Sequence, residues 1–445
     1  MASELKFNQS DRSVEVTASV KKQYELLPYP MRDPERELET LRYVNLDELA
    51  AINHKCLRGR LDLSKPTRYL VAGGGTGDST VFLAEQLRNF DAEIVHVDLS
   101  EKAMEIARRR IEKRGLQNKV TFKQGSLLDL SPANSGYFDY INCSGVLHHL
   151  KDPAAGLAAL NSVMKPQGAM GLMVYGKYGR TAIYQMQRFI ELAGLRGAEP
   201  SPELFQELRR LLDSLPATSW HTHGKMIMTF IKEADDSELY DLFFHTCDQA
   251  YSVTGLVELL ASSRLFLLNF TGESRHFYDP QLAFQNSAWW REIANKPVAE
   301  QREMAEIYWG CLIKHAFWVA REPDRQVNPT QLNLIPGWSE MSRMVGVRNS
   351  IIAHPNENWE IDFLLRGSIK TTIQVETPPL VKELCKLIDD ELSLKEIVDR
   401  IKENAKLSGG YQEADILPTI LKAIRRLCEY DFLFLRSPET VSIRR

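Results

Sequence analysis

The chain has 445 residues, of which 44% are hydrophobic and 26% are charged, and its net charge is -4. This is the composition of a soluble globular protein, and at roughly 150 residues per domain the length allows for about two or three domains. The weak negative charge excludes a global basic field that would attract nucleic acid or acidic membranes. No apolar run is long enough to cross a bilayer, and residues 1–25 lack the apolar stretch of a secretory signal.

Residues 66–175 alternate between strand-like and helix-like stretches. The predicted strands are residues 67–72, 93–98, 119–124, 137–143 and 169–175. The predicted helices between them are residues 79–89, 101–114 and 154–164, and a turn is predicted at 165–168. Strands that alternate with helices of this length predict parallel pairing with crossover helices.

The rest of the chain is predicted to complete this sheet and to add a second unit. A core domain at 66–325 would carry helical insertions at about 178–250 and 271–310, with a helix at 255–262 and strands at 264–270 and 313–321. Residues 326–375 are predicted to be a connecting region with short strands at 359–365 and 371–375. Helices at 378–388, 392–404 and 414–429 and a strand at 432–435 predict a winged-helix-like module over 376–445.

A glycine loop follows the first predicted strand and opens the first predicted helix. Gly73, Gly75 and Gly77 have the spacing Gly-x-Gly-x-Gly, whereas dinucleotide enzymes use Gly-x-Gly-x-x-Gly at a pyrophosphate. The loop therefore favours a nucleotide-like cofactor without a pyrophosphate. Asp98 ends the second predicted strand, where a carboxylate can accept hydrogen bonds from a ribose diol. The alternative is that Asp98 is a turn residue that caps the next helix.

Together with three later motifs, these residues resemble the class I S-adenosylmethionine-dependent methyltransferases. The motifs are LVAGGGTG at 70–77, VDLS at 97–100, QGSLLD at 124–129, FDYI at 138–141 leading to GVLHHLKDP at 145–153, and KPQG at 165–168. The resemblance implies an α/β, Rossmann-like, doubly wound sheet of seven strands with S-adenosylmethionine as the cofactor. The cofactor-binding residues that it implies are Gly73, Gly74, Gly75, Gly77, Asp98, Leu99, Ser126, Leu127, Ser144, Gly145 and His149.

The chain departs from the family at two positions. The family often has an acidic residue where this chain has Val71, and that acid usually helps to hold the methionine end of the cofactor. The family also often has Asp where Ser126 stands, although a serine can still hydrogen-bond there. Another group is therefore expected to support the methionine end.

An N-terminal segment, QYELLPYP at 23–30, resembles the stretch that precedes the core in a bacterial subgroup of these enzymes. That subgroup includes protein-lysine methyltransferases with a C-terminal winged-helix module. The segment, within an N-terminal region at 1–65, is predicted either to form a lid over the cofactor or to be a packing strap with buried tyrosines. Tyr24, Tyr29 and His148 are the candidate catalytic residues, with His148 acting as a base or orienting the substrate. The alternative for His148 is a packing role.

The predicted function is transfer of a methyl group to an acceptor nitrogen, with a protein lysine as the favoured acceptor. Three alternatives stay open: methylation of a small metabolite or natural product, a scaffold that binds the cofactor without catalysis, and an NAD-dependent oxidoreductase. Residues 376–445 hold 12 Lys and Arg against 13 Asp and Glu, so no basic face for nucleic acid is expected. A role in protein interaction or homodimerisation is favoured for this module.

The cysteine and histidine patterns predict no metal and a reducing compartment. The six cysteines are scattered, with no Cys-x-x-Cys pair, which favours free thiols in the cytoplasm over disulfides or zinc. His221 and His223 lack an Asp, Glu or Cys at a matching spacing, and His245 with Cys247 shares that shortcoming.

Overall fold

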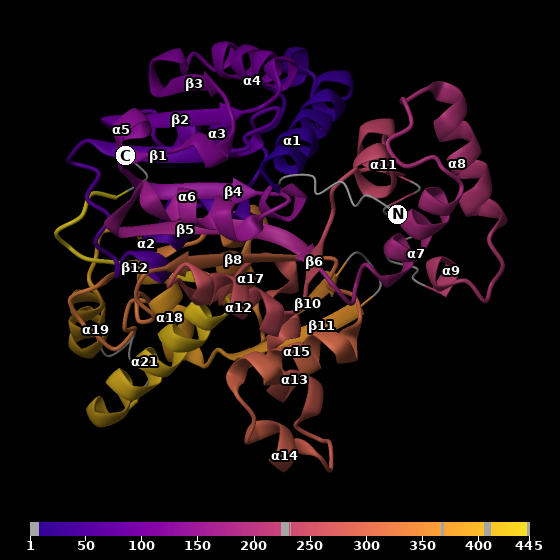
Figure 1. The fold of residues 1–445 in the computed structure, drawn as a ribbon. Coiled ribbons are helices and arrows are strands. Elements are labelled where there is room, and N and C mark those ends of the chain that lie inside the picture. The colour runs from indigo at the N-terminus through magenta and orange to yellow at the C-terminus, as the bar shows by residue number, and fades with distance from the viewer. Residues whose placement is uncertain (1–8, 224–230, 232, 366–368, 405–410, 443–445) are drawn as a thin grey trace, which may run out of the picture.

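The computed structural model describes residues 9–223, 231, 233–365, 369–404 and 411–442. Its centre is a sheet with the order β3-β2-β1-β4-β5-β8-β7, and the short β6 pairs with β5 (Figure 1). β1 to β5 run parallel, whereas β8 is antiparallel to both of its neighbours. The strands are β1 Thr67–Ala72, β2 Ala92–Asp98, β3 Val120–Gln124, β4 Phe138–Ser144, β5 Met164–Gly176, β6 Ala250–Tyr251, β7 Phe266–Phe270 and β8 Lys314–Ala320. The predicted doubly wound, Rossmann-like sheet is confirmed.

Both faces of this sheet are covered by helices. Successive residues of a strand point to opposite faces, so each strand contributes to two apolar cores. Leu70 and Ala72 of β1 lie in one core, and Tyr69 and Val71 lie in the other. The helices that cover the first face are α6 Pro153–Ser162 and α12 Val253–Ser262. Those that cover the second are α2 Leu49–Cys56, α3 Asp78–Gln86 and α4 Glu101–Lys113. The carboxyl ends of the parallel strands are therefore the edge left for a ligand.

A helical insertion between β5 and β6 has its own apolar core and lies to one side of the sheet (Figure 1). Its helices are α7 Thr181–Leu192, α8 Pro202–Ser214, α9 Trp220–His223 and α11 Asp236–Phe243. The N-terminal helix α1 Gln9–Leu26 reaches it, since Ser19 Oγ donates to Thr246 Oγ1 at 3.2 Å. A second insertion, between β7 and β8, consists of η6 Glu273–Tyr278, α13 Pro280–Phe284, α14 Trp290–Ala294 and α15 Val298–Trp309.

The C-terminal part of the chain forms a separate apolar core. Its elements are β9 Ile335–Trp338, α16 Glu340–Met344, α17 Val347–Ala353, β10 Asn358–Leu365, β11 Ile369–Glu376, α18 Pro379–Leu387, α19 Leu394–Glu403, α21 Glu413–Glu429 and β12 Leu433–Arg436. β10 and β11 form an antiparallel hairpin, and β12 pairs with β9. Val327 and Trp359, from the stretch predicted as a connecting region, pack into this same core. The strand predicted at 432–435 thus finds its partner outside 376–445, and the winged-helix assignment stays a prediction.

Two local predictions near residue 165 are wrong. Helix α6 ends at Ser162, and β5 already begins at Met164, so the predicted turn at 165–168 lies inside a strand. The pairing jumps from Phe138↔Met164 to Tyr140↔Ala169. The proline and glycine of that stretch fall in this irregularity, where an unpaired residue is tolerated.

Candidate functional site

A cavity of about 760 Å³ opens at the carboxyl ends of β1, β2 and β4. The strand order reverses at β1, and ligands of open α/β sheets bind at such a point. The volume falls within the range of small-molecule sites, roughly 300–1,000 Å³. The predicted residues that line the cavity are Tyr24, Tyr29, Gly73, Gly74, Gly75, Asp98, Leu99, Ser126, Leu127, Ser144, Gly145 and His149. Gly77 and His148 are not among the lining residues.

The glycine loop needs its glycines for two different reasons. Gly75 has a φ of 52°, and a Cβ there would lie 2.6 Å from the Tyr29 carbonyl oxygen. Gly77 has a φ of 97° and precedes α3, and a Cβ there would lie 2.8 Å from Ala107 Cβ of α4. Gly75 therefore lets the N-terminal segment lie on the cavity wall, whereas Gly77 lets two helices pack closely.

Asp98 lies at the end of β2 with both carboxylate oxygens held by backbone donors. Gly75 N–H donates to Oδ2 at 2.7 Å, and Ser100 N–H donates to Oδ1 at 2.9 Å. Burial raises the pKa of this carboxyl, and these backbone hydrogen bonds oppose the shift. The cap of α4 is Ser100, whose Oγ accepts from Ala103 N–H at 3.2 Å. Asp98 is thus oriented by the glycine loop and is not the helix cap.

The far side of the cavity beyond β2 is mostly apolar. Leu99 and Leu127 line it together with Ser126. Ser126 Oγ accepts from Leu128 N–H at 3.2 Å and caps the short helix η4 Leu127–Asp129. A flat aromatic group would find apolar contacts here, with the serine hydroxyl as a local donor.

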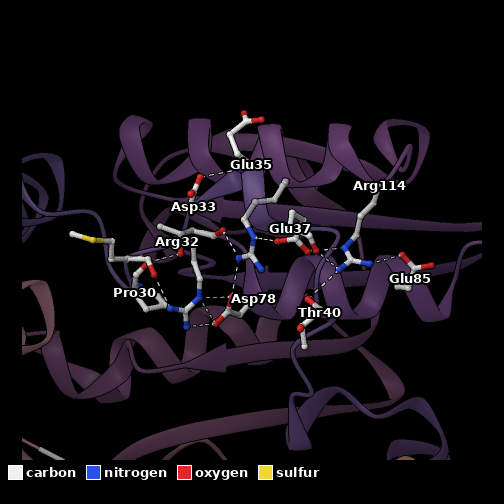
Figure 2. A network of polar contacts seen from close by, with 12 residues as sticks. Pro30, Arg32, Asp33, Glu35, Glu37, Thr40, Asp78, Glu85 and Arg114 are labelled. Carbon is white, nitrogen blue, oxygen red and sulfur yellow. Dashed lines mark hydrogen bonds and ion pairs between the residues drawn. The ribbon is translucent and has the colours of Figure 1, made fainter. Parts of the chain in front are cut away.

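Residues 24–40, here called the strap, begin at the cavity wall and are then fastened to α3 and α4 by polar contacts (Figure 2). Thr76 Oγ1 donates to the Pro30 carbonyl oxygen at 2.7 Å, and Arg32 Nη2 donates to Asp78 Oδ2 at 2.7 Å. Tyr24, Tyr29 and Pro30 line the cavity. The strap is therefore a wall of the site that contacts the glycine loop directly.

Buried ion pairs hold the second half of the strap. Arg110 of α4 contacts Glu37 at 2.5 Å and Asp78 at 2.7 Å, and Arg114 contacts Glu37 at 2.6 Å. Burial alone would raise the pKa of Asp78, but Arg32 and Arg110 hold it below its ordinary value. Every charge in this cluster has a partner of opposite sign, as buried charges require.

Of the two adjacent histidines in η5 Leu147–His149, His149 faces the cavity. Its Nδ1 lies 2.8 Å from the Cys247 carbonyl oxygen. Because a carbonyl can only accept, Nδ1 carries the proton in the neutral ring and Nε2 keeps its lone pair.

His148 lies behind its neighbour and is fully buried. Neither ring nitrogen hydrogen-bonds to any residue that the structure describes. Its ring centroid is 3.8 Å from that of Tyr175, and burial, followed by repulsion from His149, lowers its pKa well below the ordinary value. The geometry is that of a neutral packing residue, the alternative left open by the sequence.

A buried carboxylate on the helical insertion binds two tyrosines near the cavity. Tyr24 and Tyr175 each donate to Asp241 of α11 at 2.8 Å. Burial and then Asp241 raise the pKa of Tyr24 well above its ordinary value. The hydroxyl proton of Tyr24 is therefore directed at Asp241, and the catalytic role of Tyr24 stays a prediction.

His149, Asp241 and His245 each have an atom that could bind a metal ion, and these three atoms lie within 4.8 Å of one another. However, Cys247 N–H donates to His245 Nδ1 at 3.1 Å, so the neutral ring carries its proton on Nε2. Tyr24 Oη lies 3.4 Å from that nitrogen, and both Asp241 oxygens accept from tyrosines. These hydrogen bonds explain the cluster without a metal ion.

Three polar residues of the site were missed by the sequence reasoning: Asp47, Asn142 and Asp241. Asn142 lines the cavity from β4, and its Nδ2 donates to both oxygens of Asp47 at 2.9 and 3.0 Å. A polar side chain near the carboxyl end of the predicted strand 137–143 was the available signal for Asn142. Asp47 and Asp241 are distant in sequence from every motif and carried no such signal.

Residues 70–170 match the family described as "Methyltransferase domain". The chain contains a methyltransferase domain. An uncharacterised protein from Synechococcus is 34% identical over 225 residues, which is 51% of this chain and 52% of that protein. A ubiquinone biosynthesis O-methyltransferase from Thiobacillus denitrificans is 31% identical over 137 residues, 31% of this chain and 53% of that enzyme. The chain thus spans about half the length of the curated relatives that it matches.

The fold around the methyltransferase domain also has a solved counterpart. The structure of PKMT2 from Rickettsia typhi in complex with AdoHcy has a TM-score of 0.60 and 18% sequence identity, covering 88% of this chain and 75% of that one. This likeness supports the class I methyltransferase fold. Within the described part of the chain, no helix combines the length and apolar character of a membrane span.

Proposed function

We propose that this chain transfers a methyl group from S-adenosylmethionine to an acceptor nitrogen, with a protein lysine as the favoured acceptor. The observation that carries the proposal is the cavity at the strand-order reversal, which the glycine loop and Asp98 line together. The match of residues 70–170 to a methyltransferase domain supports it. In the related PKMT2 structure, the bound molecule is AdoHcy, the product of such a transfer.

The residues present fit this cofactor. Asp98 has its two oxygens oriented by backbone donors and would accept from the ribose diol. Leu99, Ser126 and Leu127 would contact the adenine, while Ser144 and Gly145 lie toward the methionine end. The cofactor supplies the reactive methyl group when bound, so the protein's task is to align the acceptor with it.

An amine acceptor is favoured by the cluster beside the strap. Asp241 provides a buried negative charge, and the rings of Tyr24 and Tyr29 line the adjoining cavity. A carboxylate with aromatic faces suits an ammonium group, which such surroundings attract. His149 Nε2, left unprotonated by the Cys247 carbonyl, is placed to take the proton that the ammonium must lose before it attacks. The catalytic role predicted for His148 is therefore assigned to His149.

Methylation of a small metabolite is the second candidate. Two observations favour it: three residues of the strap narrow the cavity from one wall, and the relatives include ubiquinone biosynthesis O-methyltransferases. A small acceptor would fit within the cavity, whereas a protein lysine would have to reach into it from outside.

The test is a titration followed by a labelling experiment. Calorimetry with S-adenosylmethionine should show binding by the wild type and by Asp213→Asn, whose carboxylate is exposed on α8. Binding by Asp98→Ala should be weaker by about 100-fold. Incubation with methyl-labelled S-adenosylmethionine and host lysate should then place label in the protein fraction. Label only among small molecules would overturn the lysine assignment, and absence of cofactor binding would overturn the enzyme proposal.

A further inference from the structure

Asp47 is a fully buried carboxylate directly behind the cavity wall. It ends the short helix η2 Asn45–Asp47, and its side chain is 0% exposed. Asn142 Nδ2 donates to Oδ1 at 2.9 Å and to Oδ2 at 3.0 Å. The Ser79 side chain also favours the ionised form of this carboxyl. A carboxylate buried this completely requires compensation from its surroundings.

Both of these partners line the cavity. Asn142 lies on β4 opposite Val71 of β1, and Ser79 lies in the first turn of α3. Asp98 approaches the same cavity from β2, on the other side of β1. Two acidic groups therefore flank the glycine loop, one directly at the cavity wall and one behind a layer of polar side chains.

Among the residues that the structure describes, Asp47 has hydrogen-bond donors but no cationic partner. Burial raises its pKa to about 7, and the groups that oppose this shift are the neutral side chains of Ser79, Asn142 and Tyr140. A buried carboxylate that lacks an ionic partner is costly when ionised. A positively charged ligand group on the cavity side of Asn142 would supply the missing charge.

The orientation of the Asn142 amide follows from this contact. A carboxylate only accepts, so the amide nitrogen must face Asp47 and the amide oxygen must point away from it. None of the described residues donates a hydrogen bond to that oxygen, and Asn142 lines the cavity. The oxygen is thus an acceptor that an ammonium group in the cavity can use.

We infer that Asp47, acting through Asn142 and Ser79, positions the ammonium of the methionine end of the cofactor. The inference rests on the proposed function, because that cofactor carries an amino-acid group beyond its sulfur. Asp47 is a positioning residue: it orients the amide that contacts the ammonium and places a negative charge behind it. Asp47 should therefore contribute to the affinity only for ligands that carry the amino-acid group.

The test compares two ligands that differ in that group. S-Adenosylhomocysteine has the adenosine, the sulfur and the amino-acid end, whereas 5′-methylthioadenosine has only the first two. Calorimetric Kd values are measured for both ligands with the wild type, with Asp47→Asn and with Asp213→Asn, the exposed control on α8. Thermal unfolding of each variant verifies that it is folded.

Asp47→Asn should weaken the binding of S-adenosylhomocysteine by about 10- to 100-fold, as expected when a hydrogen bond to a charged group is lost. It should change the affinity for 5′-methylthioadenosine by less than about twofold, and the control should change neither. If Asp47→Asn does not fold, Asn142→Ala provides the same comparison from the cavity side and should show the same selective loss.

If the folded variant lost affinity equally for both ligands, the inference would be overturned, because Asp47 would then only support the cavity as a whole. Binding of neither ligand by the wild type would overturn the proposed function as well. The two failures are distinguishable, since the first leaves wild-type binding intact.

Discussion

The two ends of the cavity are built in different ways. The end at β2 is assembled from neighbouring parts of the chain: the loop at 73–77 orients Asp98 through Gly75 N–H at 2.7 Å. The end at β4 and β5 is assembled from distant segments, since Asp47 meets Asn142 and Tyr24 meets Asp241. The end proposed to hold the nucleotide is thus a local motif, whereas the end proposed to hold the methionine and the acceptor depends on how the strap and the helical insertion pack.

The largest expected effect lies at the acceptor end. His149→Ala should lower the rate of methyl transfer on the order of 1,000-fold, because a base contributes roughly 10²–10⁴. The matched variant His148→Ala should mainly lower stability, since that ring is fully buried. Initial rates of label transfer to the acceptor fraction and thermal melting would separate the two. An equal loss of rate in both variants, with cofactor affinity unchanged, would contradict the assignment of the base.

The nucleotide end should respond through affinity. Asp98→Ala should weaken the binding of S-adenosylmethionine by about 100-fold, since two hydrogen bonds from the ribose to a charged group contribute roughly 1.5 kcal/mol each. Calorimetric titration measures this directly, with Asp213→Asn as the exposed control. Retention of full affinity by the folded Asp98→Ala variant would show that the cofactor does not lie at β2.

The contact between the strap and the glycine loop can be tested with a pair of glycines. Gly75 and Gly115 have φ values of 52° and 65°, so alanine is strained at both. A Cβ at Gly75 would meet the Tyr29 carbonyl oxygen at 2.6 Å, whereas one at Gly115 would meet nothing within 4 Å. Gly75→Ala should therefore weaken cofactor binding by about tenfold (~1.4 kcal/mol) and Gly115→Ala should not.

In this pair, both variants should lose stability by about 1–2 kcal/mol from backbone strain. Urea unfolding measures that loss and calorimetry measures the affinity. Equal affinities in the two variants would mean that the strap does not shape the cofactor site.

A separate prediction concerns how stability depends on pH. The pKa of Asp47 is raised from 3.8 to about 7 by burial, so between these values the folded state holds a proton that the unfolded state has released. Stability from this group is therefore lost as pH rises from about 4 to 7, by at most about 4 kcal/mol. In Asp47→Asn, the free energy of unfolding should decline less steeply as the pH rises.

Urea unfolding at pH 5, 6 and 7 would measure this slope. Glu48, whose pKa is also raised to about 7 by burial, contributes a decline of the same sign in both proteins and so cancels in the comparison. Parallel slopes for the wild type and Asp47→Asn would show that Asp47 is solvated, and its proposed role would lose its basis.

Much of the fold could be predicted because its signals are local. The apolar run at 67–72 matches β1 residue for residue, and the predicted helix at 101–114 differs from α4 by one residue. The errors arose where pairing overrides local preference, as at 165–168, whose proline and glycine indicated a turn but lie inside β5. The strand near 432–435 was predicted, but its pairing with β9 was not, because pairing partners leave no local signal.

The sequence by itself determined the end of the cavity that is proposed to hold the nucleotide, since the glycine spacing and the acid at the end of β2 are set by short stretches of chain and by the strand–turn–helix geometry. It also showed, through Val71, that the methionine end lacks its usual nearby acid. Only the tertiary structure decided that Asp47 lies behind Asn142, that Asp241 binds two tyrosines and that His149 rather than His148 faces the cavity. These contacts join residues up to 217 positions apart, and such distances are closed by packing, which no spacing along the chain records.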